Sequence, residues 1–357
     1  MAQPTRKRRL AVAASLIALS VSALLPISAV AAPGPMTIDV TLGTTCVRAK
    51  VPAGTPSARI VWKDAELNVK VDTVEEADAD GNIGACVGND YVEIGDRVRV
   101  RVGSASHLLI VPELTLVQDR VNDHYRGRGP AGDYVRLICG LTNGFEPCVQ
   151  SWKIKVNSAG NWGYNPGWDI FGGDFMSLNW TSSAGDKVRR LNYAPFVVVT
   201  IDKAAVSGST QPGTSSDVLL MKANGAVRGG AAVTGGPIDG LFQGRFEKDT
   251  TGERVLARVG NLVSSDIASD AEFIIRDVEA APNVGTQRVP GQCPTPTGRF
   301  VRAWSFRDGA EVDGAYSWPD GDGSFRLTTL EFESGDRLLI SCDLSTGDRI
   351  QKWFAVP

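Results

Sequence analysis

The feature that most constrains the fold is a pattern that recurs about every eighty residues along the chain. In each copy a glycine and an acidic residue precede a strand of alternating apolar and polar residues. These steps begin at Gly95, Gly173, Gly252 and Gly335, at intervals of 78, 79 and 83 residues. A period of this length is typical of tandem small domains, so we predict four of them.

Two earlier signals precede each Gly-acid step in the same order. A turn rich in proline and glycine is followed by an apolar strand, as at Pro52 and Ile60 in the first copy. A polar turn that ends in glycine comes next. The second residue after that glycine is large and apolar in every copy, so we expect it to point into each core. These residues are Ile83, Trp162, Phe242 and Phe325.

The residues after the Gly-acid step alternate in character. Apolar side chains occupy the third, fifth and seventh positions after the glycine, and in the third copy they are Val255, Ala257 and Val259. A period of two predicts a strand with one buried face. By the same alternation, Trp180 in the second copy is predicted to be a core residue, as is Trp162.

Helical periodicity is missing from every window outside the N-terminal segment. Glycine and proline instead divide the chain into short segments, which predicts sandwich or barrel domains of antiparallel strands. Domains of this size bury a modest core, for which a disulfide is a plausible supplement.

The N-terminal segment, residues 1–31, is predicted to be a secretory signal peptide. A basic run from Arg6 to Arg9 precedes an apolar run from Leu10 to Leu25, and Ala29 and Ala31 fit a cleavage site. The alternative is a membrane anchor, but the apolar run is short for a spanning helix. We therefore expect a soluble protein that is secreted or held at the cell envelope, with no membrane span after signal removal.

Net charge bears on the partner of the protein, and cysteine content bears on its compartment. Without residues 1–31 the chain has a net charge of −7, whereas a nucleic-acid partner would favour a basic face, so we expect no nucleic-acid partner. The cysteines fall in even numbers within copies, which predicts disulfides inside domains. The pairs are Cys46 with Cys86, Cys139 with Cys148 and Cys293 with Cys342. We expect the last pair to cross a sandwich interior and the second to join neighbouring strands across a turn.

The turn sequences carry a resemblance to a known class of domains. The segments "ADADGNIG", "NSAGNWGY" and "DGDGSFRL" resemble the Asp-Gly-Asn-Trp/Phe turn of bacterial immunoglobulin-like modules, and "PIDGLFQG" is a looser match. The carboxypeptidase-regulatory type of sandwich shares much of this pattern. The resemblance implies an all-β fold with four tandem Ig-like antiparallel β-sandwich domains after the signal peptide. The domains are residues 32–113, 114–195, 196–278 and 279–357. Such modules act as spacers, adhesive surfaces or carbohydrate-contacting accessories, and the motifs carry no catalytic residues.

The best candidate for ligand binding is an aromatic stretch in the second copy. It contains Tyr164, Trp168 and Asp169, and rings beside amide and carboxylate groups suit the faces and hydroxyls of sugars. Trp162 is set aside as core, whereas Trp168 has no aromatic equivalent in the other copies. We expect Trp168 to face a ligand, so that its loss weakens glycan binding without lowering thermal stability.

Two charged features have a plain structural alternative. Acidic turns at Asp78 and Asp320 offer oxygen ligands for calcium, but aspartate and glycine also favour tight turns. The stripe of Arg97, Arg99 and Arg101 would suit an acidic polysaccharide, but it also protects a strand edge. We therefore predict no metal site and no cofactor.

Catalytic motifs are missing from the sequence. It has no G-x-S-x-G elbow, no H-E-x-x-H helix and no phosphate loop, and its histidines, His107 and His124, have no recognisable nucleophile partner. The leading interpretation is a non-enzymatic exported array with a structural, adhesive or accessory role, whose partner is an extracellular polysaccharide or a surface protein. The first alternative is a carbohydrate-binding protein that contacts its ligand through the second domain. The second alternative is a hydrolase.

Overall fold

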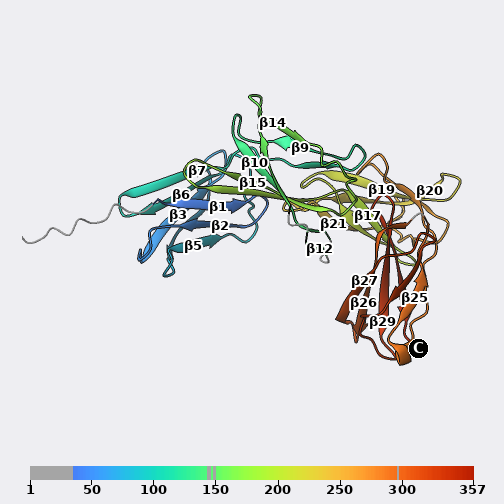
Figure 1. Ribbon diagram of the computed structural model, residues 1–357. Coiled ribbons are helices and arrows are strands. Elements are labelled where there is room, and N and C mark those ends of the chain that lie inside the picture. The colour runs from blue at the N-terminus through green and yellow to red at the C-terminus, as the bar shows by residue number, and fades with distance from the viewer. Residues whose placement is uncertain (1–34, 143–145, 148–149, 296) are drawn as a thin grey trace, which may run out of the picture. The chain divides into compact units, whose positions relative to one another are not determined.

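Strands make up the ordered elements of the protein (Figure 1). The computed structural model describes residues 35–142, 146–147, 150–295 and 297–357, so the predicted signal peptide lies outside the described residues. Within these ranges there is no α-helix, and the one helical element is a short 3-10 helix, η1 (Val284–Thr286).

The strands fall into four sets, which we call modules 1 to 4. Module 1 contains β1 (Thr37–Thr41), β2 (Cys46–Lys50), β3 (Ser57–Lys63), β4 (Val69–Glu76), β5 (Asn82–Cys86), β6 (Arg97–Val102) and β7 (Ala105–Ile110). Module 2 contains β8 (Val117–Asp119), β9 (His124–Arg128), β10 (Tyr134–Cys139), β11 (Leu141–Thr142), β12 (Glu146–Pro147), β13 (Ser151–Lys155), β14 (Asn161–Tyr164), β15 (Phe175–Thr181) and β16 (Lys187–Tyr193). Module 3 contains β17 (Phe196–Thr200), β18 (Ala205–Ser209), β19 (Ser215–Met221), β20 (Val227–Thr234), β21 (Leu241–Arg245), β22 (Leu262–Ser265) and β23 (Glu272–Ile274). Module 4 contains β24 (Glu279–Ala280), β25 (Val289–Gln292), β26 (Thr297–Arg307), β27 (Ala310–Ser317), β28 (Ser324–Leu327), β29 (Arg337–Leu344) and β30 (Arg349–Ala355).

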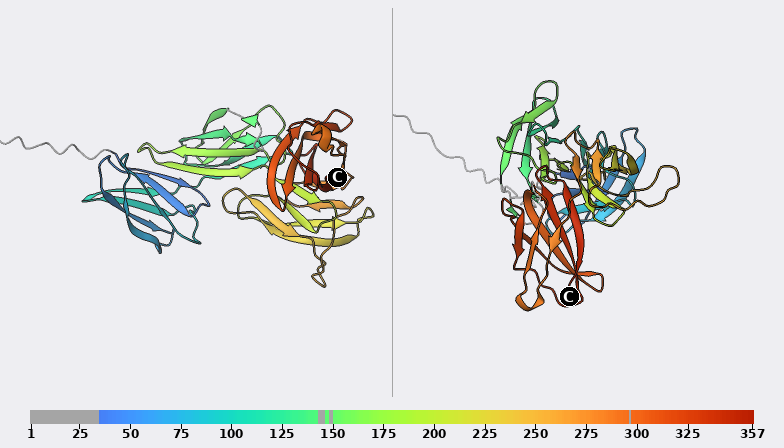
Figure 2. Two further views of the ribbon diagram at one scale, coloured as in Figure 1. Left: turned by 90° about the horizontal axis from the view of Figure 1, so that it is seen from below. Right: turned by 90° about the vertical axis from the view of Figure 1, so that its right-hand side faces the viewer.

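Each module pairs its strands in the same order. Three strands form one antiparallel layer, as in β1-β2-β5, and four strands form the other, as in β4-β3-β6-β7. The corresponding four-stranded layers of modules 2 to 4 are β13-β10-β15-β16, β20-β19-β22-β23 and β27-β26-β29-β30. The views in Figures 1 and 2 show the long strands of module 4, in orange and red, running beside one another. The prediction of an all-β chain of repeated antiparallel Ig-like sandwiches is confirmed.

The predicted inward residue of each copy lies in a core. Ile83 is 6% exposed, and Trp162, Phe242 and Phe325 are each 5% exposed. The glycine two residues earlier has a positive φ in every copy, for example +83° at Gly81, which is why glycine recurs there. The sequence repeat therefore reflects both a turn that requires glycine and a large apolar residue that packs in the core.

The Gly-acid step is a turn whose carboxylate is buried. Asp96 accepts the backbone N–H of Glu93 at 2.9 Å, and Asp336 accepts that of Glu333 at 2.8 Å. Both carboxylates also bond a basic side chain, which for Asp336 is Arg307 at 3.0 Å. A buried carboxylate needs such partners, so the acid fixes the turn before the strand.

In the third copy the predicted position of this step is wrong. No strand follows Gly252. Val255 and Ala257 are buried as predicted, but Val259 is 52% exposed. The equivalent turn is at Gly260, where Asn261 accepts the backbone N–H of Arg258 at 3.0 Å and β22 follows. Asparagine replaces the acid here and supplies the same acceptor, so a search for Gly-acid steps selects an earlier, unrelated one.

Modules 1 and 2 share one sheet, as do modules 3 and 4. Strand β1 pairs in parallel with β16, and β17 pairs in parallel with β30, which makes two seven-stranded sheets. The buried apolar residues form two clusters that follow the same division. The sequence therefore repeats once per module, whereas each seven-stranded sheet and each core cluster comprises two modules.

Each parallel pairing is anchored by a buried aspartate. Asp186 accepts the backbone N–H of Ile38 at 2.9 Å, and Asp348 accepts that of Val197 at 2.8 Å. Both follow a glycine with positive φ just before the last strand of an even-numbered module, and both are buried. A carboxylate that is inaccessible to water is thus satisfied by the neighbouring module.

Two disulfides lie inside modules. Cys46–Cys86 joins the neighbouring strands β2 and β5, and Cys293–Cys342 joins the end of β25 to β29 in the opposite layer of module 4. Cys293 and Cys342 are both buried, as expected for a bond across the interior. Cys148 lies outside the described residues, so its pairing with Cys139 stays a prediction.

We expect Asp186→Ala to loosen the junction of β1 with β16. The change leaves the N–H of Ile38 without its acceptor, which is expected to cost about 1–3 kcal/mol of unfolding free energy. Hydrogen exchange at the Ile38 amide should accelerate. Asp348→Ala is the matched control, because it should accelerate exchange at Val197 and leave Ile38 unchanged. Unaltered exchange at Ile38 in Asp186→Ala would contradict the anchoring role.

Candidate functional site

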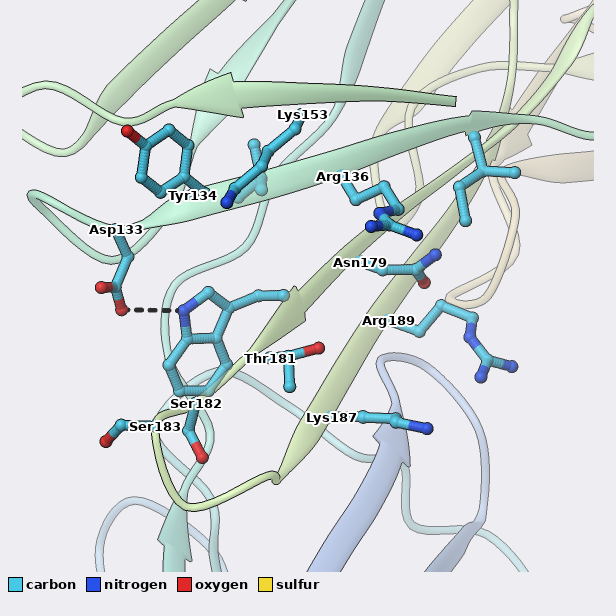
Figure 3. A pocket seen from close by; sticks show the side chains of 13 residues that line it. Asp133, Tyr134, Arg136, Lys153, Asn179, Thr181, Ser182, Ser183, Lys187 and Arg189 are labelled. Atoms are coloured by element: carbon cyan, nitrogen blue, oxygen red, sulfur yellow. Dashed lines mark hydrogen bonds between the residues drawn. The ribbon is translucent and has the colours of Figure 1, made fainter. Parts of the chain in front are cut away.

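A cleft of about 670 Å³ lies on the exposed face of the four-stranded layer of module 2. Strands β10, β13, β15 and β16 supply its floor, because alternate residues of each strand point away from the core. Figure 3 shows Arg136, Asn179 and Arg189 side by side on this floor, with Lys187 beyond them. We call this surface the basic cleft.

The charge of the basic cleft is largely uncompensated. Arg136, Lys153 and Lys187 have exposed side chains, and no carboxylate among the described residues forms an ion pair with them. Arg189 lies 3.8 Å from Asp39 in a pair that is exposed on both sides, and such pairs contribute little. The cleft therefore offers positive charge to a ligand.

Two aromatic side chains border the cleft. The indole N–H of Trp180 donates to Asp133 Oδ2 at 3.0 Å, drawn as a dashed line in Figure 3, and this bond fixes the ring. The ammonium groups of Lys153 and Lys155 lie 4.3 and 4.4 Å from the centre of the Tyr134 ring. Tyr134 thus holds cations at the rim. Trp180, whose cross-strand partners Val135 and Val188 are buried, borders the cleft from the core side at the end of β15.

Modules 3 and 4 repeat this framework with different side chains. The registers place Arg302 where module 2 has Arg136, and Arg349 where it has Lys187. Asp343 takes the position of Thr181 and bonds both arginines, at 2.6 and 3.2 Å. Burial lowers the pKa of Arg349 to about 10, and the Asp343 carboxylate opposes that shift. In the second sheet the two arginines pair with Asp343 and are largely buried, whereas the equivalent Arg136 and Lys187 of the first sheet are exposed.

The predicted binding residues lie apart from the basic cleft. Trp168 is 37% exposed, but its ring centre is 5.4 Å from that of Trp152, which in turn lies 5.3 Å from Tyr164. Asp169 is exposed. The aromatic contacts give Trp168 a packing role that the sequence did not reveal, and its contact with a ligand stays a prediction.

Trp162 and Trp180 differ in their surroundings. Trp162 is buried, as predicted. Trp180 packs against the core of modules 1 and 2 on one side, and on the other side it lines the basic cleft. The predicted core position therefore describes only half of its environment, because the residue lies at the end of β15.

The acidic turn at Asp78 has a local structural role, and the arginine stripe lies along β6. Asp78 accepts backbone N–H groups of Asp80 and Asn82, and no group of metal-ligating side chains occurs in the part of the chain that the structure describes. Arg97 and Arg101 are exposed on β6, where Arg99 is half-buried. Neither feature gathers the aromatic, amide and basic groups that meet in the basic cleft.

The histidine of module 1 is bound in a structural arrangement. His107 Nε2 lies 2.6 Å from Asp186 Oδ1, and Ser182 Oγ donates to the other oxygen at 3.1 Å. The carboxylate lies between histidine and serine, so the imidazole does not contact the hydroxyl as it does in a nucleophile–histidine pair. The arrangement instead joins His107 and Ile38 of module 1 to Asp186 of module 2.

Sequence reasoning missed the basic cleft, although its signal was present. Basic residues alternate on the polar positions of two strands, at Lys153 and Lys155 in β13 and at Lys187 and Arg189 in β16. The sequence prediction used only the apolar positions of these strands and did not consider the alternation of basic residues at the polar positions. Strand order was also needed, because these segments are distant in the sequence.

Comparison with known proteins gives no family assignment. No family model and no curated protein sequence matches the chain. A solved tetra-tandem repeat from the extending region of a large adhesion protein is 14% identical, covering 90% of this chain and 99% of its own, with a TM-score of 0.18. A Ca²⁺-stabilized adhesin, which helps an Antarctic bacterium to reach out and bind ice, is 11% identical, covering 91% and 99%, with a TM-score of 0.17. The BSP domain of a biofilm associated protein is 9% identical, covering 91% and 96%, with a TM-score of 0.18.

These neighbours are repeat domains of adhesion and biofilm proteins, but TM-scores this low carry no argument about function. Within the described ranges, no helix is long and apolar enough to span a bilayer.

Trp168→Ala is expected to lower the free energy of unfolding by about 0.5–1.5 kcal/mol, because it removes an aromatic contact with Trp152. Urea unfolding followed by far-UV circular dichroism measures this change. Trp168→Phe is the control, since it keeps a ring at the position. An unchanged unfolding midpoint in Trp168→Ala would show that the contact contributes nothing.

Proposed function

We propose that the protein is a non-enzymatic array of Ig-like modules that acts outside the cell as an adhesive or accessory protein and binds carbohydrate through module 2. The observation that carries this proposal is the basic cleft, where basic, amide and hydroxyl side chains share one open surface that a hydrogen-bonded indole borders. Sugars offer apolar faces to rings and hydroxyls to such groups. The ligand contact is therefore assigned to the cleft and not to Trp168.

The described residues support a binding role over catalysis. The cleft contains one carboxylate, Asp133, which is engaged by the Trp180 indole. A glycoside hydrolase needs two carboxyl groups on either side of the scissile bond. The floor of the cleft is a sheet whose side chains alternate regularly, and this arrangement suits an extended ligand.

The export of the chain is part of the proposal. It rests on the basic and apolar segments of residues 1–31 and on the two disulfides, since disulfides persist in oxidising compartments. Modules that pair through shared sheets would make a stable spacer between a surface and a ligand.

A glycan screen with the chain lacking residues 1–31 tests the proposal. We expect binding to at least one glycan class, and we expect Trp180→Ala to weaken it about tenfold, because the indole that borders the cleft is lost. Trp180→Phe should retain most of the affinity, and circular dichroism confirms that each variant folds.

Trp168→Ala is the matched control, since it removes a tryptophan of the same module outside the cleft. It should leave affinity unchanged. Silence of the wild type across the screen would overturn the proposal. A loss of binding in Trp168→Ala but not in Trp180→Ala would move the site to the aromatic stretch.

A further inference from the structure

We infer that the ligand of the basic cleft is an acidic polysaccharide, and that it extends over the parallel junction onto strands β1 and β2 of module 1. This inference rests on the proposed carbohydrate-binding function and names its substrate class. It follows from the register of the seven-stranded sheet β13-β10-β15-β16-β1-β2-β5, which places basic side chains of two modules on one face.

Two cross-strand rows carry this charge. The first row runs through Lys153, Arg136, Asn179 and Arg189, which are direct partners across β13, β10, β15 and β16. Neighbouring strands lie about 4.8 Å apart, so cations recur along the row at spacings that a chain of charged sugars can follow.

The second row crosses the module junction. Lys187 is the parallel partner of Asp39, and Asp39 is the partner of Arg48. A second hollow of about 690 Å³ is lined by Lys187 together with Arg48 and Lys50, and it continues the same face on module 1. Asp39 is the one acidic residue within this row, but Glu76 and Asp78 also line the hollow, so its three cations meet three carboxylates. The net positive charge of this face is therefore that of the basic cleft, and the row supplies Arg48 and Lys50 as individual contacts beyond it.

The chemistry of the cleft favours a polysaccharide over a nucleic acid. Single-stranded nucleic acids bind to successive aromatic platforms. Here two ammonium groups lie over the Tyr134 ring, and Trp180 belongs to the core-facing residues of β15, so the cleft has no succession of stacking platforms. Asn179, Thr181 and Ser183 provide amide and hydroxyl groups for sugar hydroxyls between the cations.

In the second seven-stranded sheet the positive charge of the equivalent surface is neutralised by a carboxylate. Asp343 occupies the position of Thr181 and pairs with Arg302 and Arg349. Gln351 replaces Arg189, and Ser207 replaces Arg48. The fold is the same, so the exposed charge of the first sheet is a property of its side chains and is not required by the framework.

The test introduces this neutralising residue into the first sheet. Thr181→Asp places a carboxylate opposite Lys187, as Asp343 lies opposite Arg349. Thr181→Asn has nearly the same shape without the charge. Arg245→Ala removes an exposed arginine from the second seven-stranded sheet and controls for net charge. The probes are polygalacturonate, dextran sulfate, neutral dextran and single-stranded DNA, with affinities from calorimetry.

We expect the wild type to bind polygalacturonate or dextran sulfate in preference to neutral dextran and to DNA. Thr181→Asp should weaken this binding by about tenfold or more. Thr181→Asn exchanges a hydroxyl contact for an amide without adding charge and should weaken binding by no more than about threefold, and Arg245→Ala should leave it unchanged. Binding should also be lost at about 1 M salt, where the Debye length falls to about 3 Å.

The outcomes separate this inference from the proposed function. Equal affinity for neutral dextran, or insensitivity to Thr181→Asp while Trp180→Ala still abolishes binding, would overturn the acidic ligand and leave carbohydrate binding intact. Tighter binding to DNA than to both polyanions would overturn the polysaccharide class. Silence towards every probe and throughout the glycan screen would end both proposals.

Discussion

The architecture depends on two buried carboxylates that are satisfied by a neighbouring module. Asp186 and Asp348 each accept a backbone N–H from the first strand of the preceding module, at Ile38 and Val197. A buried carboxylate without partners would be strongly unfavourable, so each aspartate holds the parallel strand in place. Arg120 extends the arrangement, since it bonds Asp348 at 3.0 Å and Asp270 at 2.8 Å and so links module 2 to modules 3 and 4.

The parallel junctions convert four sandwiches into two wide sheets, and this has a consequence for binding. A four-stranded layer of one small domain offers a short face, whereas β13 to β5 present seven strands in register. Side chains of modules 1 and 2 can then contact a single extended ligand. The two sheets share the framework and differ at Thr181 and Asp343, which indicates that the framework tolerates either an open or a neutralised face.

The sequence predicted what depends on local patterns and missed what depends on distant ones. Alternation and turn glycines were enough to place Ile83 and Phe325 in cores. The turn of the third copy was predicted at the wrong position because Asn261, and not an acidic residue, accepts the backbone N–H there. The hydrogen bond of the turn is the same, but the Gly-acid sequence pattern is missing. The bond from Ile38 to Asp186 spans 148 residues, and no local signal specifies such a pairing. The basic cleft was missed for the same reason, since it requires the strand order.

Screening reconciles a basic binding face with an acidic chain. The chain after residue 31 has a net charge of −7, so its distant field repels a polyanion at low ionic strength. At physiological salt the Debye length is about 8 Å, which suppresses that field but leaves cations in contact with the ligand effective. Arg136 and Lys187 line the cleft and act at contact distance, whereas Asp133 is the one acidic residue among the side chains that line it. The local arrangement of charge on β10 and β16, and not the total charge of the chain, therefore decides which ligands the surface can hold.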